Sequence, residues 1–134
     1  MPRVTWDQRG AAAVELALVL PLFLVLIFGT VEFGLALHAK GLLASAAREG
    51  ARFGVVFTTP RKTEAEIQAR VQNYLSQTGF AGPVAITVAG AGGNSGDPLR
   101  VTIQYDYRLR VLPRFINGML GRIDLRTDTI MRME

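Results

Sequence analysis

The sequence predicts an α+β protein with a long N-terminal transmembrane and stalk helix, a second helix, and a three-stranded antiparallel sheet. Two observations lead to this fold class. Apolar residues make up 49% of the 134-residue chain and are concentrated in one run near the N-terminus. The C-terminal half instead alternates apolar and polar residues, which is typical of strands with one buried face. A chain of this length forms one small domain with an appendage and leaves no room for a two-domain enzyme.

The apolar run predicts a membrane-spanning helix over residues 11–33. Residues 16–31 carry no charge, and extending the run back to Ala11 gives 21 residues whose one charge is Glu15. As a helix these 21 residues measure about 31 Å, close to the ~30 Å hydrocarbon core of a bilayer. A helix in a globular core would instead carry polar residues at every third or fourth position. Pro21 is expected to kink this helix, which membrane helices tolerate.

The next segment, 34–57, is amphipathic, rich in small residues and free of proline, so the same helix is expected to continue as a stalk. A single helix over 11–57 measures about 70 Å, roughly twice the hydrocarbon thickness, and must project from the membrane. Within the stalk, Gly50 and Gly54 form a small-xxx-small pair that lets another helix approach closely. The partner of this pair is either a helix of another subunit or the folded part of the same chain.

Residues 58–134 are expected to form the α+β domain. Pro60 ends the long helix, and Thr63 with Glu66 forms a capping box that begins a second helix. That helix is expected to run to about Gln77 and to stop at Gly79. Alternating apolar residues predict the strands, and a proline start predicts one more short helix. The strands cover 84–89, 99–111 and 123–133, and the short helix covers 112–121.

The composition excludes several kinds of chemistry. The chain has no cysteine and one histidine, His38, so disulfides, thiolate nucleophiles, Cys-ligated metals and Ser-His relays are not expected. The glycine-rich segment 90–98 lacks the Lys-Ser/Thr pair of a phosphate-binding loop and is expected to be a hairpin loop. We therefore predict no catalytic, cofactor-binding or metal site and no small-molecule substrate.

The net charge of +4 does not predict a nucleic-acid partner. Arg100, Arg108 and Arg110 share one face of the predicted strand 99–111, where Gln104 and Asp106 interrupt them. No aromatic side chain shares that face to stack on bases. These arginines are expected to form a solvated face or a surface for a protein partner.

Glu15 is the unusual residue of the apolar run, because a charge inside a membrane segment is costly and usually needs a partner. One interpretation is that Glu15 reaches back to the lipid headgroups. The other comes from Gly10, which follows Arg9 and precedes Glu15 by five positions. A short basic leader, Gly, four apolar residues, Glu and a long apolar helix resemble the type IV prepilin processing motif. The resemblance implies that a prepilin peptidase removes residues 1–10, and that the new α-amine of Ala11 pairs with Glu15 of a neighbouring subunit.

The flanking residues narrow the resemblance. RGAAAVELALVLPLFLVLIFGTVEFG, AAREGARFGV and the ending TDTIMRME together resemble the TadE-like family of the tight-adherence (Flp pilus) system. The family implies a pilin-like minor pilin or pseudopilin with no enzymatic activity. It also implies a bacterial inner-membrane location, with the N-terminus cytoplasmic and the C-terminal domain periplasmic. The implied partners are the prepilin peptidase, other pilins and the inner-membrane assembly platform.

Two alternatives remain open from the sequence. The first is an unprocessed, signal-anchored accessory protein of a secretion complex. The second is a secreted enzyme or binder released by signal peptidase after the small pair Gly34 and Ala36, although the apolar run exceeds the 7–15 residues usual for the apolar region of a signal peptide. The three possibilities predict Ala11, Met1 or Leu37 as the first residue of the mature protein.

Overall fold

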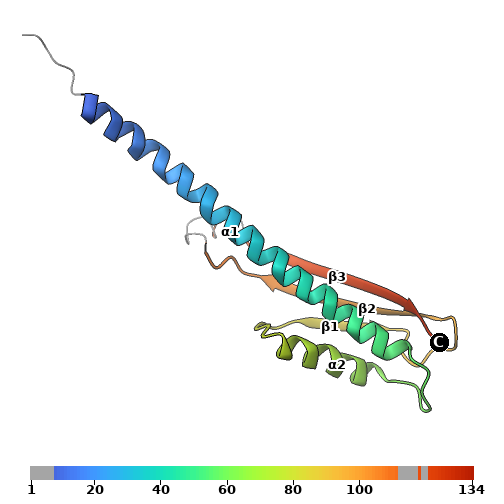
Figure 1. Ribbon diagram of the computed structural model, residues 1–134. Coiled ribbons are helices and arrows are strands. Elements are labelled where there is room, and N and C mark those ends of the chain that lie inside the picture. The colour runs from blue at the N-terminus through green and yellow to red at the C-terminus, as the bar shows by residue number, and fades with distance from the viewer. Residues whose placement is uncertain (1–7, 112–117, 119–120) are drawn as a thin grey trace, which may run out of the picture.

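The computed structural model describes residues 8–111, 118 and 121–134. Its elements in chain order are the helices and strands α1 (Gln8–Val55), α2 (Glu64–Gln77), β1 (Ala85–Ala89), β2 (Pro98–Tyr107) and β3 (Ile123–Arg132). The predicted α+β fold is confirmed (Figure 1). Residues 1–7 of the predicted leader lie outside the described residues, and so does most of the predicted short helix over 112–121.

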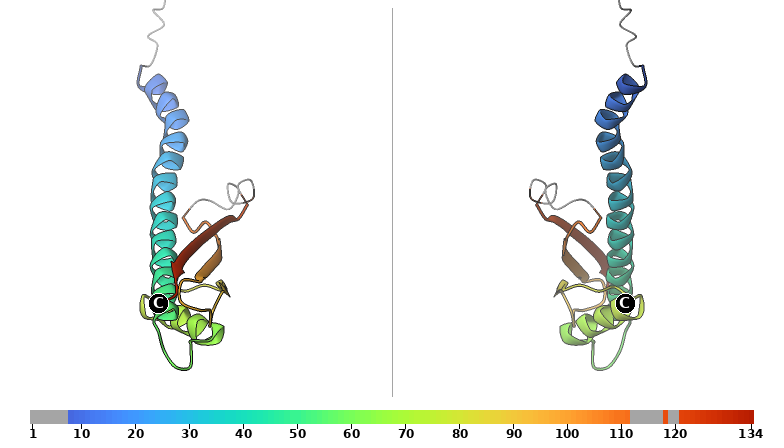
Figure 2. Two further views of the ribbon diagram at one scale, coloured as in Figure 1. Left: turned by 90° about the vertical axis from the view of Figure 1, so that its right-hand side faces the viewer. Right: turned by 90° about the vertical axis from the view of Figure 1, so that its left-hand side faces the viewer.

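The 48-residue helix α1 has two parts with different surroundings. Its N-terminal part projects away from the rest of the molecule, and all side chains from residue 10 to 28 are exposed (Figure 1). Its C-terminal part packs against the folded domain and contributes buried Leu43, Ala46 and Ala47 to the core. The helix continues through Pro21, and Figure 2 shows its N-terminal part bending away from the axis of the rest. The C-terminal part of the predicted stalk therefore belongs to the folded domain.

Both helices cover one face of the antiparallel sheet, whose strand order is β1-β2-β3. Helix α1 contacts β2, β3 and α2, and α2 contacts β1. The apolar side of β2 faces these helices, with Leu99, Val101 and Ile103 fully buried. The register pairs Val88 with Val101 and Tyr105 with Leu125. This alternation matches the pattern read from the sequence, so the strand that carries the core was predicted on its correct face.

The ends of α2 follow the predicted chemistry. The Thr63 N–H donates to the Glu66 carboxylate at 2.8 Å, and the Glu66 N–H donates to the Thr63 hydroxyl at 3.3 Å. This reciprocal pair is the capping box. At the other end Gly79 has a φ of +72°, and the N–H of Phe80 donates to the Leu75 carbonyl at 3.0 Å. A left-handed residue followed by such a bond closes the helix and favours glycine.

The prediction for the end of β2 was wrong. The strand stops at Tyr107, paired with Ile123, whereas the alternation in the sequence continues to Val111. The N–H groups of Arg110 and Val111 donate to the carboxylate of Glu32 on α1. The backbone beyond Tyr107 therefore turns from the sheet toward the long helix.

Candidate assembly site

The residues predicted for processing and pairing lie together at the start of α1. Gly10, Ala11 and Glu15 are helical and exposed, on the part of α1 that projects beyond the domain (Figure 1). Ala11 and Glu15 are one helical turn apart, so their side chains share one face. Within the described part of the chain, Glu15 makes no ion pair and no hydrogen bond. None of the described residues therefore neutralises its carboxylate.

The glycine pair lies far from these residues and packs within its own chain. A rise of 1.5 Å per residue separates Gly50 from Glu15 by roughly 50 Å along the helix axis. A Cβ added at Gly50 would overlap the side chain of Val71 on α2, and one added at Gly54 would overlap Ile67 and Leu99. The small residues thus allow α2 and β2 to approach α1 closely. Of the two partners considered for this pair, the structure places the chain's own domain there.

Sequence reasoning missed Glu32, which is only 3% exposed and follows a stretch from residue 10 to 31 in which no residue is buried. Its carboxylate accepts a hydrogen bond from the Tyr107 hydroxyl at 2.7 Å. It also accepts from the N–H of Arg110 at 3.0 Å to each oxygen and from the N–H of Val111 at 2.6 Å. Charge-assisted bonds of this kind are stronger than neutral ones. We call these four residues the Glu32 network.

The Glu32 network fixes the end of β2 to α1 where the helix leaves the domain. Burial and the hydrogen bond to the Glu32 carboxylate raise the pKa of Tyr107 to about 12, because both disfavour a second negative charge. Tyr107 therefore remains a donor across the physiological pH range. The one sequence signal for this network was a second carboxylate directly after the apolar run, and nothing local indicated its partners.

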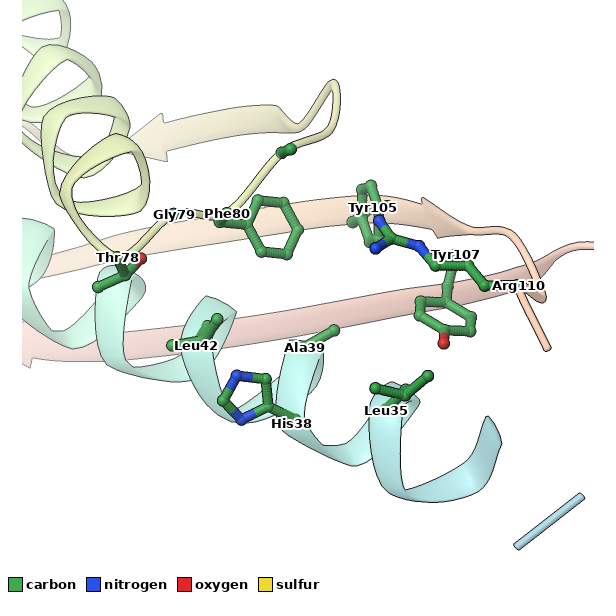
Figure 3. Close-up of a pocket in the computed structure, with 11 residues that line it drawn as sticks. Leu35, His38, Ala39, Leu42, Thr78, Gly79, Phe80, Tyr105, Tyr107 and Arg110 are labelled. Atoms are coloured by element: carbon green, nitrogen blue, oxygen red, sulfur yellow. The ribbon is translucent and has the colours of Figure 1, made fainter. Parts of the chain in front are cut away.

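A small pocket of about 160 Å³ adjoins the Glu32 network (Figure 3). Its walls come from α1, from the turn after α2 and from β2, and Figure 3 shows His38 and Leu42 on the helix side with Phe80 and Tyr105 opposite. Ligand sites for drug-sized molecules are usually 300–1,000 Å³. Among the described residues no three His, Asp or Glu side chains converge as metal ligands would. The pocket thus places His38 beside apolar and aromatic walls, with Arg110 also on its lining.

The predicted arginine face is not assembled as expected. Arg100 lies within β2 opposite Ala89 and Ile130. Arg108 and Arg110 follow the end of β2 at Tyr107, so they do not share a strand face with Arg100. All three side chains are exposed.

The comparison with protein families gives a match that lies within the long helix α1. A family model described as TadE-like protein matches residues 10–52. The match begins at Gly10, contains both Glu15 and Glu32, and ends just after Gly50. It confirms the predicted TadE-like resemblance over this segment and supports a Tad pilus-related protein. No curated protein and no solved structure matches the chain. Helix α1 is also long and apolar enough to cross a membrane, with none of its most apolar window buried in the domain.

Proposed function

We propose that this chain is a TadE-like minor pilin or pseudopilin that a prepilin peptidase cleaves after Gly10. In this role it is required for assembly of an adhesive Flp/Tad-type pilus and has no catalytic activity of its own. The observation that carries the proposal is the family match, which starts at Gly10 and covers the exposed part of α1. The partners are the membrane, the peptidase, other pilins of the same system and the inner-membrane assembly platform.

The exposed part of α1 supports this role because its apolar surface is expected to be in contact with lipid or with other helices. Its side chains from Leu16 to Val31 include large apolar groups that are exposed in the structure. Contiguous apolar surfaces of this size mark membrane or protein contacts. Lipid provides that contact while the chain is anchored in the inner membrane by a single helix, with the domain on the periplasmic side. Neighbouring pilin helices provide it in an assembled pilus.

The carboxylate of Glu15, which has no partner among the described residues, supports processing before assembly. In a membrane-spanning helix an ionised carboxylate without a partner is costly. Cleavage after Gly10 creates an α-amine on Ala11 one turn from that carboxylate. An amine of one subunit and Glu15 of its neighbour then neutralise each other within the helix bundle.

The Glu32 network argues against release of the domain by signal peptidase. A cut after Ala36 would remove Glu32 from the domain. The Tyr107 hydroxyl and the N–H groups of Arg110 and Val111 would then lose their acceptor. Unpaired donors in a half-buried site destabilise a fold. The domain is therefore best completed by the part of α1 that such a cut discards.

The test is N-terminal sequencing of the protein recovered from membranes of cells that carry the pilus system. We expect Ala11 as the first residue of the wild-type protein and Met1 as the first residue of Gly10→Val. Gly34→Val is the matched control, because Gly34 is exposed on the same helix and a Cβ there meets no atom within 4 Å. It should be processed like the wild type.

Other outcomes identify the alternatives. A wild-type protein that begins at Met1 would favour an unprocessed, signal-anchored accessory protein of a secretion complex. A first residue of Leu37 would favour a secreted enzyme or binder released by signal peptidase. Normal processing of Gly10→Val would contradict cleavage at this glycine.

A further inference from the structure

One side of α1 within the domain carries basic charges at a regular spacing. Lys40, Arg48 and Arg52 are exposed, whereas Leu43 on the opposite side is buried in the core. That opposite side packs against the sheet and α2, and Figure 2 shows the sheet on one side of the helix. Lys40, Ala44, Arg48 and Arg52 are each four residues apart, so they form one ridge on the helix surface. We call these four residues the basic ridge.

The cations of the basic ridge have no carboxylate partner among the described residues. Nη2 of Arg48 donates instead to the hydroxyl of Ser45, a neutral acceptor one turn earlier, at 3.2 Å. The adjacent carboxylate of Glu49 is turned toward α2, where it pairs with Arg70 at 2.6 Å. Arg48 and Arg52 are themselves one turn apart, and like charges at this spacing destabilise a helix. Carboxylates from another molecule would therefore stabilise the basic ridge.

Lipid phosphates lie too far away to neutralise the outer end of the basic ridge. If the membrane covers α1 as far as Phe33, Arg48 is about 22 Å beyond the hydrocarbon edge along the helix axis, and Arg52 is about 28 Å beyond it. The headgroup layer is roughly 5–8 Å thick, which leaves both guanidinium groups out of reach of phosphate. The partner of the basic ridge is therefore not the membrane that anchors the helix.

The ridge beside it continues the apolar surface of α1 into the domain. Phe33 and Leu37 are 65% and 53% exposed, and they share a four-residue spacing with Gly41 and Ser45. A Cβ at Gly41 would meet no atom within 4 Å, so no described part of the chain requires a glycine there. Glycine is unfavourable inside a helix, and small residues on this surface leave room for another helix to pack closely. A helix that covers the apolar part of α1 can thus continue alongside the basic ridge.

We infer that the basic ridge docks an acidic helix from a different pilin or pseudopilin of the same system. This inference rests on the proposed function and adds the chemistry of the partner. A second copy of this chain does not fit, because its own basic ridge would place lysine and arginine opposite lysine and arginine. A partner helix with Asp or Glu at the level of Arg48 and Arg52 would neutralise both arginines and fix its register along α1.

The test is photo-cross-linking in cells that carry the pilus system. The photoreactive residue p-benzoylphenylalanine replaces Ser45, which lies beside the basic ridge. It replaces Gln72 as the control, because Gln72 is exposed on α2. We expect irradiation to join position 45 to a helix of another pilin, and mass spectrometry to find Asp or Glu within about one turn of the joined residue. Position 72 should not join to that helix.

Charge reversal then tests whether the carboxylates bind the ridge. Arg48→Glu should lower the cross-link yield about tenfold, and replacing the mapped carboxylate of the partner with Arg should restore the yield in this background. Arg100→Glu is the matched control, since Arg100 is exposed on the face of the sheet that α1 does not cover. It should leave the yield unchanged. The urea midpoint of purified Arg48→Glu should equal or exceed that of the wild type, because a like-charge pair with Arg52 becomes an opposite-charge pair.

Several results would overturn the inference. They are the absence of a cross-link at position 45 in cells that form pili, a cross-link there to a second copy or to lipid only, and a mapped helix without carboxylates. An unchanged yield in Arg48→Glu, or a lost yield that the reversed partner does not restore, would overturn it as well. Failure of the proposed function is seen separately, because N-terminal sequencing of the same samples would then give Met1 or Leu37 in place of Ala11.

Discussion

Replacing Glu32 with leucine should destabilise the domain even though it makes the long helix more apolar. Among the described residues, the substitution leaves three donors without their carboxylate: the Tyr107 hydroxyl and the N–H groups of Arg110 and Val111. An unpaired buried donor costs about 1–3 kcal/mol, and the two half-buried N–H groups fall at the lower end because water reaches them. The three losses together amount to about 4 kcal/mol.

An opposing effect reduces this figure. Burying a carboxylate has a desolvation cost that leucine does not have, and removing it returns part of the loss. We therefore expect a net decrease of about 2–3 kcal/mol in the free energy of unfolding, against a total of 5–15 kcal/mol for typical domains. For a folded unit of about 100 residues this corresponds to a fall in Tm of about 10–20 °C.

The assay is thermal and urea unfolding of the full-length protein in detergent, followed by near-ultraviolet circular dichroism of the tyrosines. Glu15→Leu is the matched control, because it makes the same chemical change on the same helix at an exposed residue without a partner in the described chain. Its Tm should equal that of the wild type. A Tm for Glu32→Leu within about 2 °C of the wild type would refute the stabilising role assigned to the Glu32 network.

The remaining predictions concern assembly, packing and pH. Glu15→Leu should insert and be processed normally but fail to form pili, and Glu15→Asp should be a partial defect; wild-type pilus counts for both would contradict pairing through this carboxylate. Gly50→Leu should lower the free energy of unfolding by about 1–3 kcal/mol, because the new leucine side chain would overlap Val71. Gly41→Leu is the control and should leave this free energy unchanged, because a Cβ at Gly41 meets no atom within 4 Å. Equal urea midpoints for the two variants would contradict this packing. The pKa of Tyr107 is about 12 in the folded protein, against 10 for an unfolded chain. This difference contributes about 2–3 kcal/mol to the free energy of unfolding, which is fully present below pH 10 and is lost as the pH rises through 12. Tyr107→Phe should lack this component in urea titrations from pH 8 to 12, and an identical pH profile would disprove it.

The sequence predicted the elements whose signals are local. An unbroken apolar and small-residue stretch predicted one helix over 11–57, and α1 covers Gln8–Val55. The Thr63 capping box predicted the start of α2, since both partners lie within one turn. Alternation predicted β2 and its buried face because a strand shows period 2 wherever one side meets the core. These predictions required no knowledge of distant contacts.

The end of β2 could not be predicted in the same way. Leu109 and Val111 continue the alternation, so the local pattern contains no stop signal. What ends the strand is competition for its N–H groups by an acceptor on another element, 78 residues away in the case of Arg110. The same contact breaks up the predicted arginine face, because Arg108 and Arg110 leave the sheet with the backbone. Side-chain acceptors that replace a ladder bond become visible only once the elements are packed.

The two glutamates of the long helix show how far local sequence can define a role. Glu15 stands in Val14-Glu15-Leu16 and Glu32 in Val31-Glu32-Phe33, so their immediate neighbours are almost the same. Yet Glu32 is buried and accepts hydrogen bonds from three donors among the described residues of its own domain, whereas Glu15 is exposed and has no partner among the described residues. A carboxylate next to an apolar helix surface gains most from a charged or hydrogen-bonding partner. At Glu32 the domain of the same chain supplies that partner, so Glu32 acts in stabilising its own domain. At Glu15 no partner lies among the described residues, and under the proposed function the α-amine on the first residue of a neighbouring processed subunit supplies that partner.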